Sequence, residues 1–576
     1  MGNINDIELQ TASTPTYGRR LFKEEAPTHK IPDIEHDPQA VYRFIRDELQ
    51  LDGNPTLNMA SFVTTVMDEE ANQLIRDNLG KNYIDGEVYN RTLEIEQRCV
   101  RMLLDLFNAP HNMKTAEDLA LDKTTRSGWG TVAIGSSEAL MLCALSHKEQ
   151  WKKKRKAQGK SYDKPNIVIG SDVHITWVKY AQYFDVDIKW IPISEANNFV
   201  ISSEEVKRAV DEHTTCVVAV MGTSYTGQND PVEAINDVLV DIKNDSEKGW
   251  DVPLHVDGAS GGFIEPFRDD SQVPRLNWDF RLEQVKTINV SGHKFGLVYP
   301  GVGWALWKNF HEIPDKLFIT TNVLGFDEST YSLNFSRGSA MVLAQYYNFL
   351  RLGKRGYSAV VQNLMSLAHD LSNGLGSLRL TVTEHDKNTG EEEPGNILFK
   401  DKPIFTVIND AEYFPASVVR LNLKYDGQDK PLTDDDIENY LYSVHDISDK
   451  LKQSNWVVPA FTMPLEKTPP IKDENDNVIK PANQDVPAIA VMRMVVKEGI
   501  SRDMVSILIQ NYADAVIKLE QQIRGIQNSD KEYKASITFD QEAACGAVDL
   551  VEVACLKLQY TQKTSVTASR VALGAK

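Results

Sequence analysis

A lysine at the end of an apolar strand is the first residue whose position predicts chemistry. Lys294 follows the run TINVSGH and precedes Phe295. Burial disfavours the charged form of a lysine, and an amine with a lowered pKa can serve as a Schiff-base nucleophile. The ordinary alternative is a lysine whose ammonium reaches water while its stem packs on the strand. Lys294 alone is compatible with both.

An acidic side chain follows a second apolar run. Asp257, in LHVDGASGG, comes after alternating strand residues and before small residues that would let a flat ring approach the backbone. Such an aspartate can keep a pyridine nitrogen protonated, and a lysine with an acidic partner is typical of pyridoxal 5′-phosphate (PLP) sites. The alternative is that Asp257 is an ordinary helix N-cap or turn residue.

A third segment predicts a phosphate site. Gly135, Ser136, Ser137 and Glu138 precede the helical run EALMLCALSHKEQWKKK. Two hydroxyls and free N–H groups at a helix N-terminus suit a dianionic phosphate, although a plain serine cap has the same sequence. The sequence has neither a strand-bound GxGxxG nor a GxxxxGK[ST] motif for nucleotide cofactors. A phosphate site at Ser136 and Ser137, a carboxylate (Asp257) and an amine (Lys294) in one pocket favour PLP as the cofactor.

The elements between about residues 130 and 310 are those that would position these groups. Short apolar runs alternate there with helical patterns, which predicts an α/β fold with a mostly parallel, helix-covered sheet. Sheets of this kind bind ligands at the carboxyl ends of their strands. Ser224, Asp257, His293 and Lys294 all stand at such ends.

Composition changes along the chain predict four regions. Residues 1–56 read as a polar, proline-containing arm and a helix, and residues 57–355 as the large PLP-binding domain. Residues 356–526 alternate polar loops with short strands and a helix, as in a smaller α+β domain. Residues 527–576 follow no clear periodicity, and we treat them as a tail of unknown role.

The composition favours small-molecule chemistry over nucleic-acid binding. The 576 residues carry a formal net charge of −20, which would repel a phosphate backbone. Five widely spaced cysteines fit neither a disulfide framework nor a zinc site, and we expect no bound metal. The first residues lack the pattern of a secretory signal, and no apolar run is long enough to span a bilayer. We therefore expect a cytoplasmic protein without nucleic-acid or membrane partners.

The ordered blocks GSSEA, HVDGASGGF and SGHKFG resemble those of the glutamate decarboxylases, which are PLP-dependent group II decarboxylases. The resemblance extends through RDELQLDGNP, NMASF, KNYID, GTSYTG, NFSR and VMR, over residues 17–525. It implies the PLP-dependent transferase fold of type I, with a mostly parallel sheet in the large domain and a smaller α+β C-terminal domain.

The resemblance also implies roles for individual residues. The catalytic residues would be Lys294, which forms the Schiff base with PLP, Asp257, which pairs with the ring nitrogen, and His174, which lies over the ring. Ser336 would reach the phosphate from the partner subunit, so that a homodimer or a higher homo-oligomer would share its active sites. The implied cofactor-binding residues are Ser136, Ser137, His174, Ser224, Asp257, Ser291, His293, Lys294 and Ser336.

Four further positions imply the substrate. By the same resemblance, Ser61, Phe62 and Asp85 would bind a distal carboxylate, and Arg493 would clamp the α-carboxylate. The implied reaction converts L-glutamate into 4-aminobutanoate (GABA) and CO₂. Two alternatives are a decarboxylase of another acidic amino acid, aspartate or cysteate, and a catalytically weak homologue that acts as a binding protein.

Two positions depart from the close relatives of this family. His174 stands where bacterial, plant and yeast relatives carry Gln, although His is found in the wider group II enzymes. Val323, in TTNVLGFD, stands where relatives usually carry a Tyr that helps to protonate Cα. Without a substitute for that Tyr, abortive transamination would compete with decarboxylation.

Overall fold

The computed structural model describes residues 28–110, 127–271, 273–321, 328–387, 395–422, 442–465, 471–472, 478–480, 489–527 and 530–540. The chain forms two compact units, Met1–Leu57 and Asn58–Lys576. In the first, helix α2 (Pro38–Leu49) begins with a proline and is capped by Asp37, whose carboxylate accepts a hydrogen bond from Ala40 N at 2.9 Å. A short 3₁₀ helix, η2 (Pro55–Leu57), follows it.

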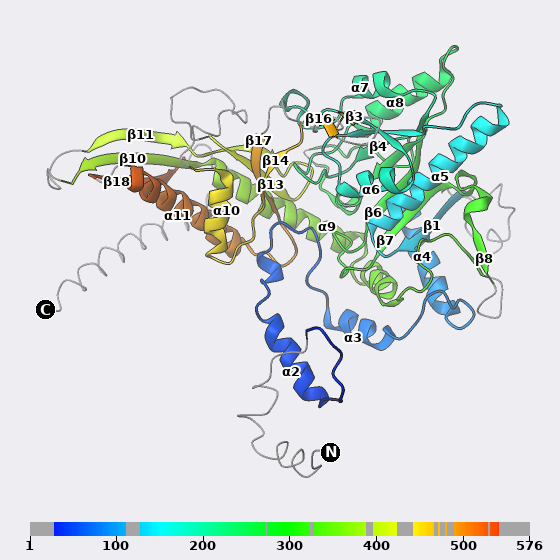
Figure 1. Cartoon of the computed structure of the whole chain (residues 1–576), viewed down its shortest axis with the longest axis horizontal. Coiled ribbons are helices and arrows are strands. Elements are labelled where there is room, and N and C mark those ends of the chain that lie inside the picture. The colour runs from blue at the N-terminus through cyan, green and yellow to red at the C-terminus, as the bar shows by residue number, and fades with distance from the viewer. Residues whose placement is uncertain are drawn as a thin grey trace, which may run out of the picture. The chain divides into compact units, whose positions relative to one another are not determined.

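The second unit contains a seven-stranded sheet in the order β1-β7-β6-β5-β4-β2-β3 (Figure 1). Strands β2 to β6 pair in parallel with one another, and β7 pairs antiparallel with β6 and β1. This arrangement confirms the predicted mostly parallel sheet. The strands are β1 (Ser127–Ala133), β2 (Asn166–Gly170), β3 (Asp187–Ile191), β4 (Thr214–Val220), β5 (Leu254–Asp257), β6 (Val285–Ser291) and β7 (Gly303–Asn309).

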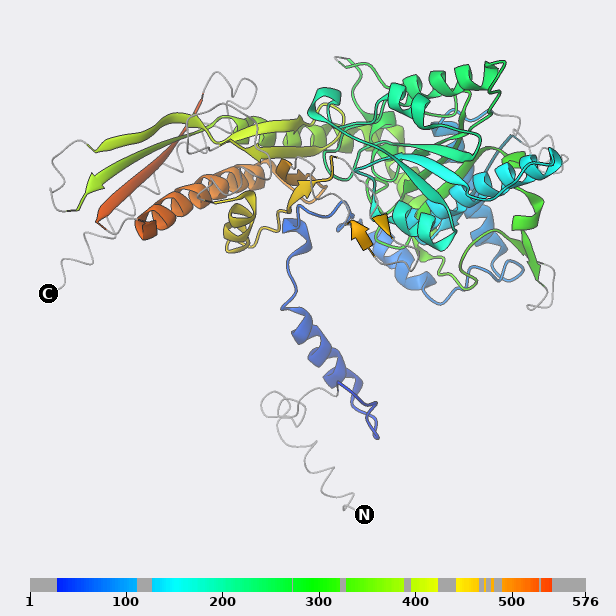
Figure 2. The same ribbon diagram turned by 45° about the horizontal axis from the view of Figure 1, so that its top comes forward.

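Helices cover both faces of this sheet, with α5 and α6 on one face and α7 and α8 on the other (Figure 2). Burial on both sides explains why the middle of β2, Ile167, Val168 and Ile169, is apolar and fully buried. One core cluster joins Ile167, Ile169 and Val218 to Leu140 and Trp177. The helices of this part are α3 (Glu69–Asn78), α4 (Asn90–Leu106), α5 (Ser136–Ala157), α6 (Ile175–Tyr183), α7 (Ser203–Ala209) and α8 (Val232–Asn244).

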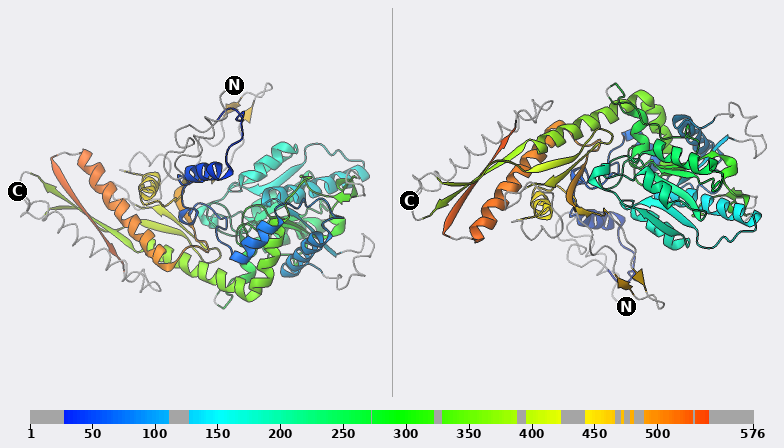
Figure 3. Two further views of the ribbon diagram at one scale, coloured as in Figure 1. Left: turned by 90° about the horizontal axis from the view of Figure 1, so that it is seen from below. Right: turned by 90° about the horizontal axis from the view of Figure 1, so that it is seen from above.

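Helix α9 (Ala340–Gly376) leads from the large sheet to the C-terminal part and bends at Gly353, which has φ 57° (Figure 3). The predicted domain boundary at 355–356 lies just after this bend. The C-terminal part has one antiparallel sheet in the order β12-β13-β17-β14 and another in the order β11-β10-β18. Its elements are β10 (Leu378–Asp386), β11 (Asn396–Pro403), β12 (Phe405–Asp410), β13 (Ala416–Leu421), α10 (Val444–Lys452), β14 (Ala460–Met463), β17 (Ile489–Val495), α11 (Arg502–Gln527) and β18 (Lys531–Phe539).

This antiparallel part confirms the predicted smaller α+β region. Strand β18 lies in the segment 527–576, to which the sequence assigned no element, and pairs with the whole of β10. Two small antiparallel pairs complete the described strands: β8 (Ile319–Thr321) with β9 (Glu328–Thr330), and β15 (Ile471–Lys472) with β16 (Val478–Lys480). Among the described residues, each helix is too short or too polar to cross a membrane.

The close approach of β7 to the start of α5 gives a prediction about Gly303. A Cβ atom there would lie 2.4 Å from the carbonyl carbon of Gly135 and 2.7 Å from Ser136 N. Because both contacts are backbone, Gly303→Ala should lower the free energy of unfolding by about 1–3 kcal/mol. Urea denaturation would measure this. The matched control is Gly525→Ala in α11, where the new Cβ meets nothing within 4 Å and should be neutral or stabilising. Equal stability of both variants would contradict the prediction.

Candidate active site

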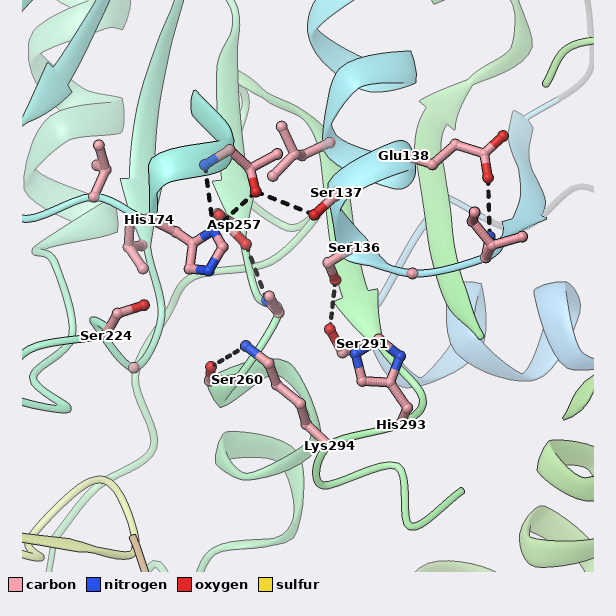
Figure 4. A pocket seen from close by; sticks show the side chains of 18 of the residues that line it. Ser136, Ser137, Glu138, His174, Ser224, Asp257, Ser260, Ser291, His293 and Lys294 are labelled. Carbon is pink, nitrogen blue, oxygen red and sulfur yellow. Dashed lines mark hydrogen bonds between the residues drawn. The ribbon is translucent and has the colours of Figure 1, made fainter. Parts of the chain in front are cut away.

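A pocket of about 360 Å³ lies at the carboxyl ends of β4, β5 and β6, beside the start of α5 (Figure 4). The parallel register explains this, because Val220, Asp257 and Asn289 are neighbours across the three strands. The pocket brings together eight of the residues predicted to bind the cofactor: Ser136, Ser137, His174, Ser224, Asp257, Ser291, His293 and Lys294.

Lys294 directs its amine into this pocket from the turn after β6. Its Nζ donates to Ser260 Oγ at 2.9 Å and lies 5.0 Å from the centre of the Phe62 ring. Desolvation lowers the pKa of Lys294 to about 8; Asp257 opposes this shift, and the positive charge of Arg493 adds to it. The neutral amine that a Schiff-base lysine requires is therefore much more abundant at neutral pH than in a lysine of ordinary pKa.

Asp257 ends β5 and is 4% exposed. Its Oδ1 accepts from Asn289 Nδ2 at 3.0 Å and from Ala259 N at 3.1 Å, and its Oδ2 accepts from Trp177 Nε1 at 2.9 Å. A carboxylate has about four acceptor positions. Three donors of the described residues therefore leave room on Oδ2 for one more N–H group.

The start of α5 has the features of an anion site. Gly135 is the N-cap, and the Ser136 hydroxyl bonds to Ser291 Oγ at 2.7 Å, while the Ser137 hydroxyl bonds to Thr176 Oγ1 at 3.1 Å. These hydroxyls thus face neighbouring side chains and do not serve as ordinary serine caps.

The carboxylate of Glu138, in the first turn of α5, points away from the predicted phosphate site. Glu138 accepts from Ile134 N and from Leu333 N, each at 2.9 Å. Its carboxylate is therefore held by backbone N–H groups, and the positive end of the 22-residue helix remains available to a phosphate.

His174 caps α6 at the pocket wall. Its Nδ1 accepts from Thr176 N at 3.3 Å and lies 2.8 Å from Thr176 Oγ1. Desolvation lowers the pKa of His174, and the charge of Lys294 adds to this effect. Desolvation also lowers the pKa of His293 to about 4, again with a contribution from Lys294. Both rings are therefore neutral at pH 7 and add no further positive charge near the lysine.

Arg493, on β17, lies against the same aromatic ring as Lys294. Its guanidinium carbon is 4.6 Å from the centre of the Phe62 ring, and one terminal nitrogen donates to Ala60 O at 2.9 Å. Arg493 is 9% exposed, its burial lowers its pKa to about 10, and its Nε has no hydrogen-bond partner among the described residues. A buried guanidinium with a spare donor is suited to a carboxylate ligand.

Residues 58–65 form a strap between these two cations. Met59 N donates to Val457 O at 2.9 Å, and Met59 O accepts from Val495 N at 3.0 Å. At the other end, Thr64 Oγ1 donates to Lys294 O at 2.6 Å. Ser61, predicted to bind substrate, accepts from Val63 N at 3.2 Å within the strap. The strap thus connects the C-terminal sheet to the turn that carries the lysine.

Five predicted site residues are not among those lining the pocket. Ser61, Phe62 and Arg493 lie on or against the strap beside Lys294. Asp85 is half-buried between α3 and α4, and Ser336 is exposed. Their segments adjoin, because Tyr83 N donates to Arg337 O at 2.7 Å. Val323 lies outside the described residues.

Sequence reasoning missed Ser260, which lines the pocket, and the two side chains that donate to Asp257, Trp177 and Asn289. Ser260 stands in the same HVDGASGG block as Asp257, and Trp177 stands three residues after His174. Asn289 had a usable signal, because a polar residue at every second position of a buried strand is unusual in a parallel sheet.

Comparison with known proteins identifies the family. The model of the pyridoxal-dependent decarboxylase conserved domain matches residues 29–400. Glutamate decarboxylase of Petunia hybrida is 40% identical over 505 residues, which cover 88% of this chain and 86% of the relative. Glutamate decarboxylase of Aliivibrio fischeri is 35% identical over 490 residues, covering 85% and 89%.

The chain belongs to the glutamate decarboxylase family.

Solved structures agree with this membership of the glutamate decarboxylase family. Glutamate decarboxylase of Lactobacillus brevis superposes with a TM-score of 0.70 at 31% identity, covering 88% of this chain and 98% of that one. A sphingosine-1-phosphate lyase of Burkholderia pseudomallei, at 18% identity and a TM-score of 0.61, covers 86% and 94% and shares the fold. The predicted family and fold type are confirmed.

The cofactor of this decarboxylase family is PLP, and the pocket residues fit it. The amine of Lys294, the spare acceptor position on Asp257 and the hydroxyls at the start of α5 correspond to an aldehyde, a ring N–H and a phosphate. His293 Nδ1, buried and without a hydrogen-bond partner among the described residues, is available beside the phosphate seat.

The lowered pKa of Lys294 predicts how PLP uptake depends on pH. The neutral amine is the reactive form, and it increases as the pH rises through about 8, the pKa of this lysine. Uptake of PLP by the apoprotein, followed by visible absorbance, should accelerate between pH 6 and 8 and level off above pH 8.5. Lys294→Arg should take up none covalently. A rate still climbing at pH 10, as for an ordinary lysine, would contradict the prediction.

Proposed function

We propose that the protein decarboxylates L-glutamate at its α-carbon, with PLP as the cofactor, and releases GABA and CO₂. The observation that carries the proposal is the convergence of Lys294 and the buried guanidinium of Arg493 on one aromatic ring, that of Phe62. The names of the relatives support the choice of glutamate. The cytoplasmic location expected from the sequence stays a prediction.

Arg493 has the properties needed to orient the reacting carboxylate. Its planar guanidinium can donate two parallel hydrogen bonds, and the rings of Phe62 and Phe461 hold it from two directions, at 4.6 Å and 5.7 Å. A carboxylate clamped in this way cannot rotate freely, so the bond to the α-carbon keeps one orientation relative to the cofactor plane. PLP, when bound, supplies the electron sink for the electrons that CO₂ leaves behind.

Lys294 and Asp257 then control the protons. The carboxylate of Asp257 would accept the ring N–H of bound PLP and so favour the protonated ring, which is the state that withdraws electrons. Lys294 Nζ, with a pKa of about 8 and a hydrogen bond to Ser260, can return a proton to the α-carbon near neutral pH. Lys294 is therefore our candidate for this step in a chain that has Val323 at the loop position where relatives carry Tyr.

A substrate panel tests the proposed function. Purified protein with PLP should release CO₂ from L-glutamate faster than from aspartate or cysteate, and Lys294→Ala should release none.

Arg493→Gln should lower kcat/KM by at least about thirtyfold, because it removes one side of a buried charge pair. Arg420→Gln is the matched control, since Arg420 lies on the adjacent strand and pairs with the exposed Glu195. Release of CO₂ from aspartate alone would favour the related decarboxylase, and PLP binding without turnover would favour a binding protein.

We also propose that the active unit is a homodimer whose subunits share their sites. Asp85 and Ser336 lie on adjoining segments apart from the pocket of their own subunit, which supports delivery of both residues to the pocket of a partner subunit. In that position Asp85 would meet the distal carboxylate of glutamate, together with Ser61 and Phe62. Two facing carboxylates require a shared proton, so activity would favour mildly acidic pH.

Mixed dimers test the shared site. Lys294→Ala and Asp85→Ala chains should each be weakly active or inactive alone. A heterodimer of the two would hold one doubly defective and one intact site, so co-expression should restore about a quarter of the wild-type activity. If Asp85 acts within its own subunit, every site carries one defect and mixing restores nothing. Size-exclusion chromatography with light scattering would confirm that the chains assemble.

A further inference from the structure

A chain of buried hydrogen bonds runs from Asp257 away from the pocket. His255 and Asp257 lie on one face of β5, opposite Thr287 and Asn289 of β6 in the parallel register. All four side chains are at most 4% exposed. Central strands of parallel sheets are normally apolar, and buried polar groups destabilise a fold unless each is hydrogen-bonded. The fold alone gives no reason for this polar cluster.

The bonds form a continuous sequence of five side chains. Asn289 Nδ2 donates to Asp257 Oδ1 at 3.0 Å, and Asn289 Oδ1 lies 2.8 Å from His255 Nε2. Thr287 Oγ1 then lies 2.7 Å from His255 Nδ1 and 2.7 Å from His147 Nε2. His147 comes from α5, the helix whose first turn forms the phosphate seat.

Elementary chemistry fixes the direction of each bond. An ionised carboxylate only accepts, so the amide nitrogen of Asn289 faces Asp257 and its oxygen accepts from His255 Nε2. Burial lowers the pKa of His255 to about 4 and the pKa of His147 well below its usual range, so both rings are neutral at pH 7. A neutral imidazole carries one N–H, and Nδ1 of His255 therefore accepts from the Thr287 hydroxyl.

The last bond follows in the same way. Because the Thr287 hydroxyl donates to His255, its oxygen accepts from Nε2 of His147. Every hydrogen in the sequence thus points toward Asp257. Aligned bonds of this kind polarise one another, and in a water-free interior their effect on a charge at the end is strengthened.

We infer that His147, Thr287, His255 and Asn289 form a polarised relay that holds Asp257 ionised and aimed at the ring nitrogen of the cofactor. These are positioning residues, because they act through Asp257 and not on the substrate. A proton on Oδ1 of Asp257 would conflict with the Asn289 N–H and would require the relay to reverse. The ring N–H would face Oδ2, and a proton transferred there would remove the negative charge toward which every hydrogen of the relay points, so the relay also opposes that transfer. This inference rests on PLP as the cofactor.

Other groups close the relay to water. Trp177 donates to Asp257 Oδ2 and packs edge-on against the His255 ring, with centres 5.2 Å apart. The Cys143 thiol, also on α5, lies against Thr287, and burial raises its pKa well above the usual range. It therefore stays neutral and adds no competing charge.

The test uses a pair of substitutions at Thr287, which touches neither the pocket nor Asp257. Thr287→Val keeps the shape and removes the hydroxyl, while Thr287→Ser keeps the hydroxyl. Each variant is loaded with PLP that carries ¹⁵N in its ring, and the ring-nitrogen chemical shift reports protonation. In Thr287→Val, the ring-nitrogen chemical shift should move toward the value of unprotonated PLP. The PLP dissociation constant of this variant should rise about three- to tenfold, because a hydrogen bond that supports a buried charge is lost. Thr287→Ser should match the wild type in both.

A second substitution covers the case in which Thr287→Val does not fold. His147→Phe removes the last donor and should move the ring-nitrogen signal in the same direction by a smaller amount. A signal that stays fully protonated in every folded variant, or that moves equally in Thr287→Ser, would overturn the relay. The readout needs only bound PLP, so it remains valid if glutamate is not the substrate, and a wild type that binds no PLP would instead overturn the proposed function.

Discussion

A negative charge kept out of water is the constraint on which the rest of the site depends. Asp257 is nearly inaccessible to solvent, and its carboxylate is stabilised by three N–H donors from three different segments. Loss of hydration makes such a charge unstable unless its partners are already in place. The parallel sheet provides them, because the register of β5 and β6 sets the donor of one strand beside the acceptor of the next. The negative charge of this anion also raises the pKa of Lys294, against the lowering by desolvation and by the charge of Arg493.

The geometry of the large sheet also explains why the pocket lies where it does. The carboxyl ends of β4, β5 and β6 reach the same edge, and the N-terminus of α5 ends at that edge because the helix follows β1 after a short turn. Gly303 lets β7 pass close to this turn, so the phosphate seat is held by backbone contact. The chemical groups are thus placed by regular elements, while the segments that complete the site, such as residues 58–65, are irregular.

The sequence was sufficient to predict groups that depend on the end of a single element. Lys294, Asp257 and the Ser136–Ser137 pair each follow a recognisable strand or begin a helix, and the structure places all of them around one pocket. The sequence did not reveal the relay, since its bonds join residues that are 32 to 140 positions apart. Nor did it assign β18, because the short alternating pattern of Lys531–Phe539 becomes meaningful only beside β10. The sequence also did not show that Asp85 and Ser336 lie apart from the pocket of their own chain, because that depends on how the segments around Tyr83 and Arg337 pack together.

The strap of residues 58–65 has a consequence for the order in which the site can form during synthesis. The ribosome makes this segment early, but its partners Val457 and Val495 are among the last parts of the described chain to be made. A nascent chain can therefore complete the large sheet and still lack the contact between Ala60 and Arg493. Arg493 joins the strap only when most of the polypeptide has been made, so incomplete chains that already contain Lys294 lack the buried guanidinium beside Phe62.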